Sequence, residues 1–223
     1  LLVAVIAFAQ ETRQLAVDKP QAIADLRTAE GASLVNAKWY VQPAHIEDKG
    51  FYLPGPQKGG GDAMPLYPTG RAIKTQSLHP QVGATDFEEG FKEIKSTELE
   101  SRQGTGLFSF VWYKLDLVIP EVIGKLNTTG TTAVFEMVVD DYSEIWVNGK
   151  QMVGFGQTGN GLISGYNTRN RVILTNDAKA GEKFVIYVLG INGPVGKLPD
   201  NYIWVRNAVV DFYQSGLPVN TSW

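Results

Sequence analysis

Short apolar runs separated by turn residues dominate the chain from residue 109 onward. They are rich in β-branched and aromatic residues and alternate apolar with polar positions, which is typical of half-buried strands. Together with one earlier run, they predict strands at residues 36–43, 109–119, 132–139, 143–147, 150–153, 171–174, 184–190 and 203–212. Asn148-Gly149, between two of these runs, is a hairpin signal. No helical period of useful length separates the runs, so the pattern predicts an all-β, antiparallel β-sandwich of the jelly-roll kind.

The N-terminal third follows a different pattern. Asp18, followed three residues later by Gln21, predicts the capped start of a short N-terminal helix. In this helix Ile23 and Leu26 share one face, and Gly31 marks the end. We expect the helix to pack on the outside of the main domain.

Between about residues 50 and 90 the periodic pattern is lost, and proline and glycine are frequent. A stretch of this length without regular structure is often functional when it occurs in a compact domain. We therefore predict a long irregular loop over the surface of the sandwich. Two interpretations stay open: the loop contacts a ligand, or it only connects two strands.

The first nine residues are almost wholly apolar and end in Ala7-Phe8-Ala9, a small-x-small pattern of the kind that signal peptidase cuts. We interpret residues 1–9 as a signal-peptide remnant, with a buried N-terminal strand as the alternative. Residues 10–34 then hold the helix and its lead-in, residues 35–213 the β-sandwich domain, and residues 214–223 a linker-like tail. Export of a chain without cysteine predicts a secreted or periplasmic protein.

Composition narrows the classes of function. The 223 residues carry a formal net charge of −3 without a long basic run, which argues against nucleic acid as a partner. Cysteine is absent and histidine occurs twice, so thiolate chemistry and histidine-rich metal sites are poorly supplied. The apolar start is too short for a membrane span. We find no adequate set of nucleophile, base and orienting group, which favours a binding protein over an enzyme.

Several motifs carry a resemblance to a known family. The stretch FEMVVDDYSEIWVNG at residues 135–149 resembles the strand pair of galactose-binding-like jelly rolls that accompany β-galactosidase-type catalytic domains. Together with GYNTRNRV at 165–172, GINGP at 190–194, NYIWVR at 201–206 and DFY at 211–213, it resembles a narrower group. This is the domain found N-terminal to the propeller in bacterial proteins of the gluconolactonase (senescence-marker, regucalcin-like) family.

The resemblance covers roughly residues 35–213 and implies a galactose-binding-like jelly roll. The lactonase chemistry of that family belongs to a metal-binding propeller that this sequence does not contain, so no catalytic residue is carried over. What the resemblance implies is an accessory module, with carbohydrate as its ligand and a C-terminal catalytic domain as its partner.

Strand alternation separates binding candidates from core residues. Trp146 and Asn148 share a face with Glu144, while Ile145 and Val147 point to the other face, where we place the core. Trp146 beside polar neighbours suits a platform for a sugar ring. The alternative is that Trp146 is covered by the loop of residues 50–90.

A second aromatic candidate lies near the C-terminus. Trp204 and Arg206 project on the same side of their strand. A guanidinium beside an indole is either a stacked structural pair or a site for a carboxylate such as that of a uronic acid. Neutral and acidic sugars therefore both remain candidate ligands.

Polar residues of the predicted loops form a third group of candidates. Amide side chains offer a donor and an acceptor each, which matches vicinal sugar hydroxyls. The loop candidates are Gln157, Tyr166, Asn167, Arg169, Asn170 and Asn192. Asparagine is also a default residue of tight turns, so part of this group is expected to be structural.

Asp140 and Asp141 occupy the predicted turn between two strands. Adjacent carboxylates beside loop carbonyls are ligands that Ca²⁺ accepts, although a complete calcium-binding loop is absent. As a general acid and base the two are poorly placed, since neighbouring residues of a strand point to opposite faces.

These observations predict a non-catalytic carbohydrate-binding or accessory module of a secreted carbohydrate-active or lactonase-type protein. The alternative is a fragment of a gluconolactonase-like hydrolase, in which this domain only packs on a catalytic propeller. The two differ in whether Trp146 and the loop around Tyr166 lie exposed around a concavity.

Overall fold

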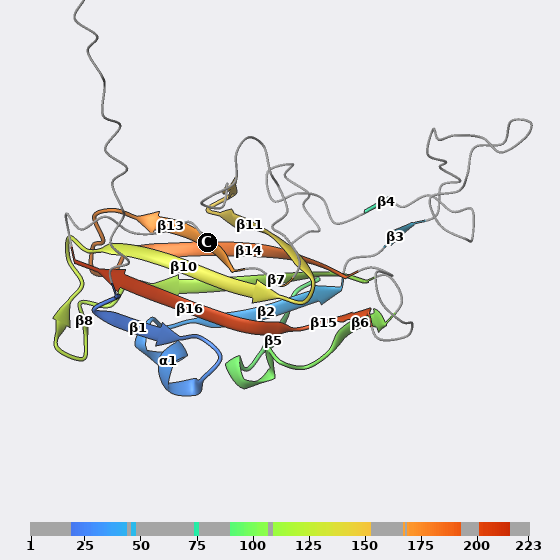
Figure 1. Cartoon of the computed structure of the whole chain (residues 1–223), viewed down its shortest axis with the longest axis horizontal. Helices are drawn as coiled ribbons and strands as arrows, with labels where there is room; N and C mark the ends of the chain where they lie inside the picture. The colour runs from blue at the N-terminus through green and yellow to red at the C-terminus, as the bar shows by residue number, and fades with distance from the viewer. Residues whose placement is uncertain are drawn as a thin grey trace, which may run out of the picture.

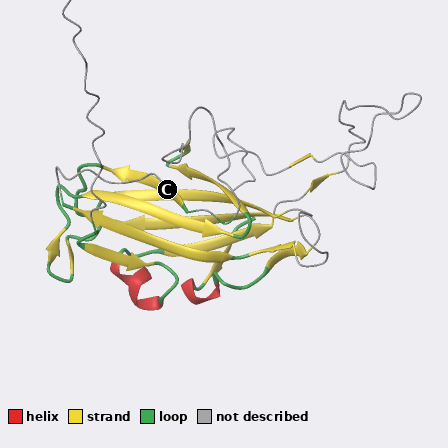
Figure 2. Cartoon of the chain, viewed as in Figure 1, coloured by secondary structure: helices red, strands yellow, loops and turns green. Residues whose placement is uncertain are grey.

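The computed structural model describes residues 19–43, 46–47, 74–75, 90–106, 109–152, 167, 169–192 and 201–214. It confirms the predicted fold class, because two antiparallel sheets pack face to face as a β-sandwich (Figure 1). Strands dominate the described residues and the helical segments lie at one margin (Figure 2). The predicted signal-peptide remnant, most of the segment 50–90 and the tail beyond residue 214 lie outside the described residues.

The two sheets differ in size. The smaller has the strand order β1 (Ala22–Asp25), β16 (Val205–Tyr213), β10 (Thr132–Val139) and β13 (Asn170–Thr175). The larger has the order β12 (Lys150–Gln151), β11 (Tyr142–Val147), β14 (Lys183–Asn192), β7 (Ser109–Val118), β2 (Lys38–Pro43) and β5 (Lys92–Ile94). Three short pairs accompany them: β15 (Asn201–Ile203) with β6 (Gln103–Gly106), β3 (Ile46–Glu47) with β4 (Lys74–Thr75), and β8 (Val122–Ile123) with β9 (Leu126–Asn127).

The long strands β7, β10, β11, β13, β14 and β16 alternate between the two sheets along the chain. Each connection therefore crosses the sandwich, which keeps sequence neighbours on opposite sides of one core, as in jelly-roll folds. Strand alternation then fills that core. In β7, for example, Tyr113, Leu115 and Leu117 point inward and are buried.

The predicted N-terminal helix is wrong in position. Residues 22–25 form β1, which pairs with β16 from Ala22 opposite Phe212 to Asp25 opposite Val209. Ala24 and Leu26 are buried in the core, while Ile23 between them is 54% exposed, so the period is two rather than three or four. β1 also belongs to the smaller sheet, so the sandwich begins before residue 35.

The helix lies one step later, at α1 (Ala29–Leu34). Its N-cap is Thr28, whose hydroxyl accepts from the Gly31 amide at 2.9 Å. Gly31 is inside the helix instead of ending it. A Cβ at this position would meet the Asp25 carbonyl oxygen at 2.0 Å, so glycine is needed for α1 to approach the end of β1.

Both outward faces of the sandwich carry buried side chains. On the larger sheet, Trp112, Trp146 and Tyr187 form a second apolar cluster opposite the main core. On the smaller sheet, Glu136 and Arg171 are buried outside the core. Neither helix in the described part of the chain, α1 or the 3-10 turn η1 (Ser96–Glu98), is long and apolar enough to cross a membrane.

Candidate functional site

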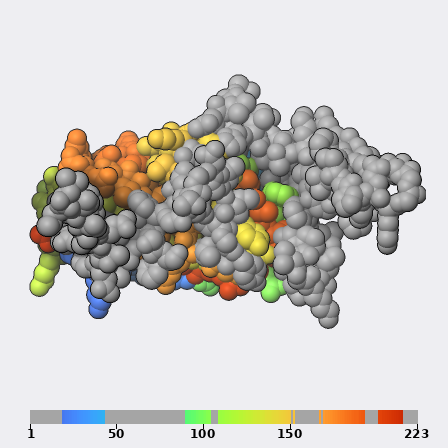
Figure 3. Space-filling model, turned by 45° about the horizontal axis from the view of Figure 1, so that its top comes forward, coloured from blue at the N-terminus to red at the C-terminus, as the bar shows by residue number. Residues whose placement is uncertain are grey.

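Partly exposed aromatic and cationic side chains gather where β15 leads into β16. Ile203 and Val205 are buried in the core, so Tyr202, Trp204 and Arg206 alternate with them on the outward side. This confirms the prediction that Trp204 and Arg206 share a side. In Figure 3, red atoms of the C-terminal strands lie beside green and yellow atoms from segments far away in the sequence.

Arg102, from the segment before β6, completes this group, because β6 pairs with β15. Its guanidinium carbon lies 5.5 Å from the ring centroid of Tyr202 and 5.6 Å from that of Trp204. The guanidinium carbon of Arg206 lies 5.2 Å from the Trp204 centroid. We call Arg102, Tyr202, Trp204 and Arg206 the arginine–tryptophan cluster. On its outward side the cluster consists of two guanidinium groups that lie over aromatic rings.

The turn between β10 and β11 brings Asp140 and Asp141 to the same place. The Asp140 amide donates to the Trp204 carbonyl at 3.1 Å, and Nη2 of Arg206 pairs with Oδ2 of Asp140 at 3.2 Å. Both aspartates are buried, at 3% and 6% exposed. The carboxyl pair is thus held against the edge of the cluster.

The expectation that Asp140 and Asp141 point apart is wrong, because the two carboxyl groups are hydrogen-bonded to each other. They lie in a turn outside the regular strands, where the alternation rule does not apply. Burial, the bond from Asp140 and its negative charge raise the pKa of Asp141 to about 7, against the opposing effect of Arg206. Asp141 is therefore protonated below neutral pH.

The cation beside this pair is Arg206, whereas the sequence suggested Ca²⁺ at this position. Among the described residues, no group of three or more acidic, histidine or cysteine side chains is arranged to hold a metal ion. A protonated carboxyl is also a poor ligand for a hard cation. Calcium at Asp140 and Asp141 stays a prediction, and the geometry gives it no support.

Buried amides flank the cluster. Nδ2 of Asn192 donates to the Tyr202 carbonyl at 2.7 Å, and Asn201 directly precedes Tyr202. Oδ1 of Asn192 and Nδ2 of Asn201 are buried and have no hydrogen-bond partner among the described residues. Buried polar atoms of this kind normally find a protein, water or ligand partner. The cluster therefore has unused hydrogen-bonding capacity at its inner edge.

The remaining predicted asparagines have structural contacts. Asn148 has a φ of 50° in the hairpin turn, and its Oδ1 accepts from the Val185 amide at 2.9 Å. Asn170 is buried and donates to the Ser143 hydroxyl. Asn167 has a φ of 51°, and its amide donates to the Asp141 carbonyl at 2.8 Å. The structure brings only Asn192 and Asn167 beside the elements that carry the cluster.

Trp146 lies on a different part of the molecule, on the outward face of the larger sheet. It is 1% exposed, packs with Trp112 and Tyr187, and its indole N–H donates to the Glu144 carboxylate. Trp146 is thus buried, and cover by the loop of residues 50–90 lies outside the described residues. A binding role for Trp146 stays a prediction, and its burial removes the open ring face that a sugar platform requires.

Arg169 belongs to yet another group, on the outward face of the smaller sheet. Its Nε lies 3.7 Å from the Glu136 carboxylate, and its side chain is 55% exposed. Behind it, Arg171 pairs with Glu136 at 2.7 Å and with Asp211 at 3.1 Å. Gln157 and Tyr166 lie outside the described residues.

The sequence does not indicate Arg102 as a site residue, and it does not indicate the buried ion pairs of Arg171. Arg102 stands in a turn with no periodic pattern, so nothing local marks it. Arg171 could have been noticed, because arginine and glutamate at paired strand positions are unusual inside a sheet unless they neutralise each other. The signal was the register of β10 with β13, which only the fold provides.

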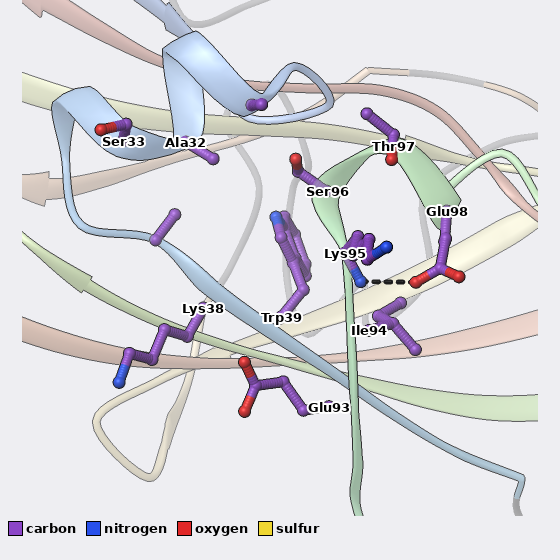
Figure 4. A pocket seen from close by; sticks show the side chains of 12 residues that line it. Ala32, Ser33, Lys38, Trp39, Glu93, Ile94, Lys95, Ser96, Thr97 and Glu98 are labelled. Carbon is purple, nitrogen blue, oxygen red and sulfur yellow. Dashed lines mark hydrogen bonds between the residues drawn. The ribbon is translucent and has the colours of Figure 1, made fainter.

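A separate open cleft of about 600 Å³ lies between α1, β2, β5 and η1 (Figure 4). Two lysines and two glutamates line it together with small residues: Lys38, Lys95, Glu93, Glu98, Ala29, Ala32, Ala37, Ser33, Ser96 and Thr97. Its one aromatic, Trp39, is 1% exposed and donates to the Leu26 carbonyl. The cleft therefore offers neither an open ring face nor a dominant charge.

Comparisons with known proteins return neither a matching family model nor a matching curated protein. Similar solved structures include a β-glucuronidase from Faecalibacterium prausnitzii (12% identity, TM-score 0.38), with 89% of this chain and 32% of that chain covered. A β-glucosidase from Kluyveromyces marxianus (12% identity, TM-score 0.35) is covered over 76% of this chain and 17% of that chain.

An adhesin A domain from Candida glabrata, in complex with Galβ1-4GlcNAc, aligns at 10% identity and a TM-score of 0.29, over 91% of this chain and 90% of that chain. These neighbours are two carbohydrate-active enzymes and an adhesin domain, and the chain spans less than a third of the length of the two enzymes. None of these three is a gluconolactonase, so the narrower resemblance stays a prediction.

Proposed function

We propose that this chain is a non-catalytic carbohydrate-binding module, accessory to a larger secreted carbohydrate-active or lactonase-type protein, and that it binds its ligand at the arginine–tryptophan cluster. The observation that carries the proposal is the partly exposed pair Tyr202 and Trp204, surrounded by guanidinium donors and by buried amides with unused hydrogen bonds. Aromatic surface with a few convergent polar groups is the usual form of a sugar site.

The carboxyl pair does not make this end of the sandwich a glycosidase site. In glycoside hydrolases the two carboxyl groups lie about 5 Å or more apart, on either side of the scissile bond. Asp140 and Asp141 are hydrogen-bonded to each other and buried, which leaves no room for a sugar between them. Their position beside Arg206 suits binding and orienting its guanidinium better than general acid catalysis.

The first experiment is calorimetric titration of the chain with a panel of neutral and acidic oligosaccharides. We expect saturable binding, with Kd values as weak as about 1 mM, or about −4 kcal/mol. Trp204→Ala should remove it. Tyr40→Ala is the matched control, because Tyr40 is a half-buried aromatic of the other sheet with a lysine at 5.4 Å from its ring.

Loss of binding in the Trp204 variant alone, with both variants folded by circular dichroism, supports a sugar site at the cluster. No binding across the panel by the folded parent chain would overturn the proposal. In that case a packing role beside a catalytic partner becomes the better account of this domain.

A further inference from the structure

Arg206 is the residue on which the cluster depends, because three different groups use it. Its guanidinium stacks on Trp204, its Nη2 pairs with Asp140, and its backbone carbonyl accepts from Nη1 of Arg27 at 2.8 Å. The side chain is nevertheless 46% exposed. Only one of its five N–H donors has a hydrogen-bond partner among the described residues.

Arg102 places a second guanidinium over the same indole, and it too belongs to the exposed residues. Where a guanidinium covers an indole face, a neutral sugar ring can stack there only by displacing it. What the cluster presents outward is therefore a set of N–H donors with positive charge. Guanidinium donors recognise carboxylates in paired, planar geometry, and such charge-assisted bonds are about twice as strong as neutral ones.

We infer that the ligand of this cluster is an acidic saccharide, whose carboxylate binds Arg206 with Arg102 beside it and competes with the Asp140–Asp141 pair for the Arg206 guanidinium. The inference rests on the proposed function and narrows its ligand class to uronic-acid-type sugars. The rings of Tyr202 and Trp204 then hold the two guanidinium groups in place.

The carboxyl pair makes this binding sensitive to pH. The charged groups that face Asp141 are Asp140 in the same turn and Arg206 from β16. From β14 the described contact is the Ile191 carbonyl, and residue 167 contributes its backbone amide. Below pH 7 Asp141 is protonated and adds no charge beside Arg206. Above pH 7 the ionised Asp141 adds a negative charge there, which holds Arg206 more tightly and repels a carboxylate.

The test uses a uronic acid trisaccharide and the same trisaccharide with its carboxyl groups reduced to alcohols. At pH 5.5 we expect the acidic form to bind the chain about 10- to 100-fold more tightly, as one charge-assisted interaction provides. Arg206→Gln should abolish that preference. Arg169→Gln is the matched control, since the Arg169 side chain is 55% exposed against 46% for Arg206 but lies beside Glu136 of the smaller sheet, and it should keep the preference.

Measuring affinity against pH distinguishes the effect of the Asp140–Asp141 pair from the effect of the overall charge of the protein. Between pH 5.5 and 8.5 the ligand stays ionised, because ordinary carboxyl pKa values lie near 4. Affinity of the parent chain for the acidic trisaccharide should fall several-fold over this range. In Asp141→Asn the amide imitates the protonated carboxyl, so the affinity should stay at its low-pH value throughout.

The outcomes are distinguishable. Equal binding of both trisaccharides keeps the proposed function and overturns the acidic-ligand inference, whereas no binding of either overturns both. Binding of hexaglutamate without either trisaccharide would assign the cluster to acidic peptides and also overturn the inference. A fall in affinity with pH that persists in Asp141→Asn would refute the role of the carboxyl pair. Thermal melts of each variant check that it is folded.

Discussion

At the scale of single residues, the cluster is defined by what surrounds each charged group. The Arg206 guanidinium lies over Trp204 and is partly exposed, while Asp140 beside it is buried and needs a counter-charge. Asp141 meets the same requirement by retaining a proton. One aspartate is thus paired with a cation and its neighbour with a proton, two solutions to carboxyl burial in adjacent residues.

Trp146 shows the same dependence on surroundings. Trp146→Ala should lower the free energy of unfolding by about 3–5 kcal/mol, because a fully buried indole packed with Trp112 and Tyr187 would leave a cavity. Urea denaturation at constant pH measures the change. Tyr40→Ala serves again as the control, with a smaller expected loss, since Tyr40 is only half-buried. A Trp146 variant as stable as the parent chain would show that the indole is not packed as described.

At the scale of elements, Arg171 ties three neighbouring strands of the smaller sheet together. From β13 it reaches Glu136 on β10 at 2.7 Å, and Asp211 at 3.1 Å and the Tyr213 hydroxyl at 2.7 Å, both on β16. Asn207 donates a further bond to Glu136 at 2.7 Å. Burial raises the pKa of Asp211, while the charge of Arg171 opposes that rise. The arginine therefore neutralises two carboxylates that the fold has removed from water.

Replacing Arg171 with methionine should cost about 3–5 kcal/mol of unfolding free energy, since it leaves Asp211 buried without its counter-charge and Glu136 with only the exposed Arg169 beside it. This loss of unfolding free energy should become smaller as pH falls toward 4, because the buried carboxyl groups that lost Arg171 can then take up protons. Denaturation curves at pH 4.5 and 7.5 provide the measurement. Arg169→Met is the control: this exposed arginine lies 3.7 Å from the same glutamate, so its loss should cost at most about 1 kcal/mol. Equal costs for the two arginines would contradict this account.

At the scale of the whole molecule, Gly190 of β14 marks a place where the two sides of the sandwich lie close together. A Cβ there would lie 2.9 Å from Cγ2 of Ile203 and 3.1 Å from Cγ1 of Val139. Glycine at this position lets β14 lie close to β10 and β15, the elements that flank the arginine–tryptophan cluster. The position of the cluster is therefore set by the packing of one sheet on the other.

Gly190→Ala should destabilise the chain by about 1–3 kcal/mol through overpacking. In an Ile203→Ala background the added methyl group has space, so the same substitution should cost less or become neutral. A double-mutant cycle in urea measures the difference as a coupling energy between the two sites. Strict additivity would show that Gly190 is not held by this contact.

Local patterning along the chain is enough to establish the fold class and to sort residues between the core and the outward faces. Strand alternation is a local property, so it assigns Ile145 and Val147 to the core and Trp204 to the side of Arg206. The same local rules misplaced the first helix. The segment 22–25 pairs with β16 almost two hundred residues away, and such pairing overrides local helix signals.

Which polar residues belong together depends instead on the tertiary packing. Asparagine suits a turn and a sugar site equally well, and only the tertiary structure shows that Asn148 and Asn170 have partners within the fold. Burial of Trp146, the bond between the two aspartates and the arrival of Arg102 beside Trp204 depend on contacts between distant segments. Periodicity specifies which face a side chain takes, whereas its neighbours across sheets and loops are specified by the packing of the whole chain.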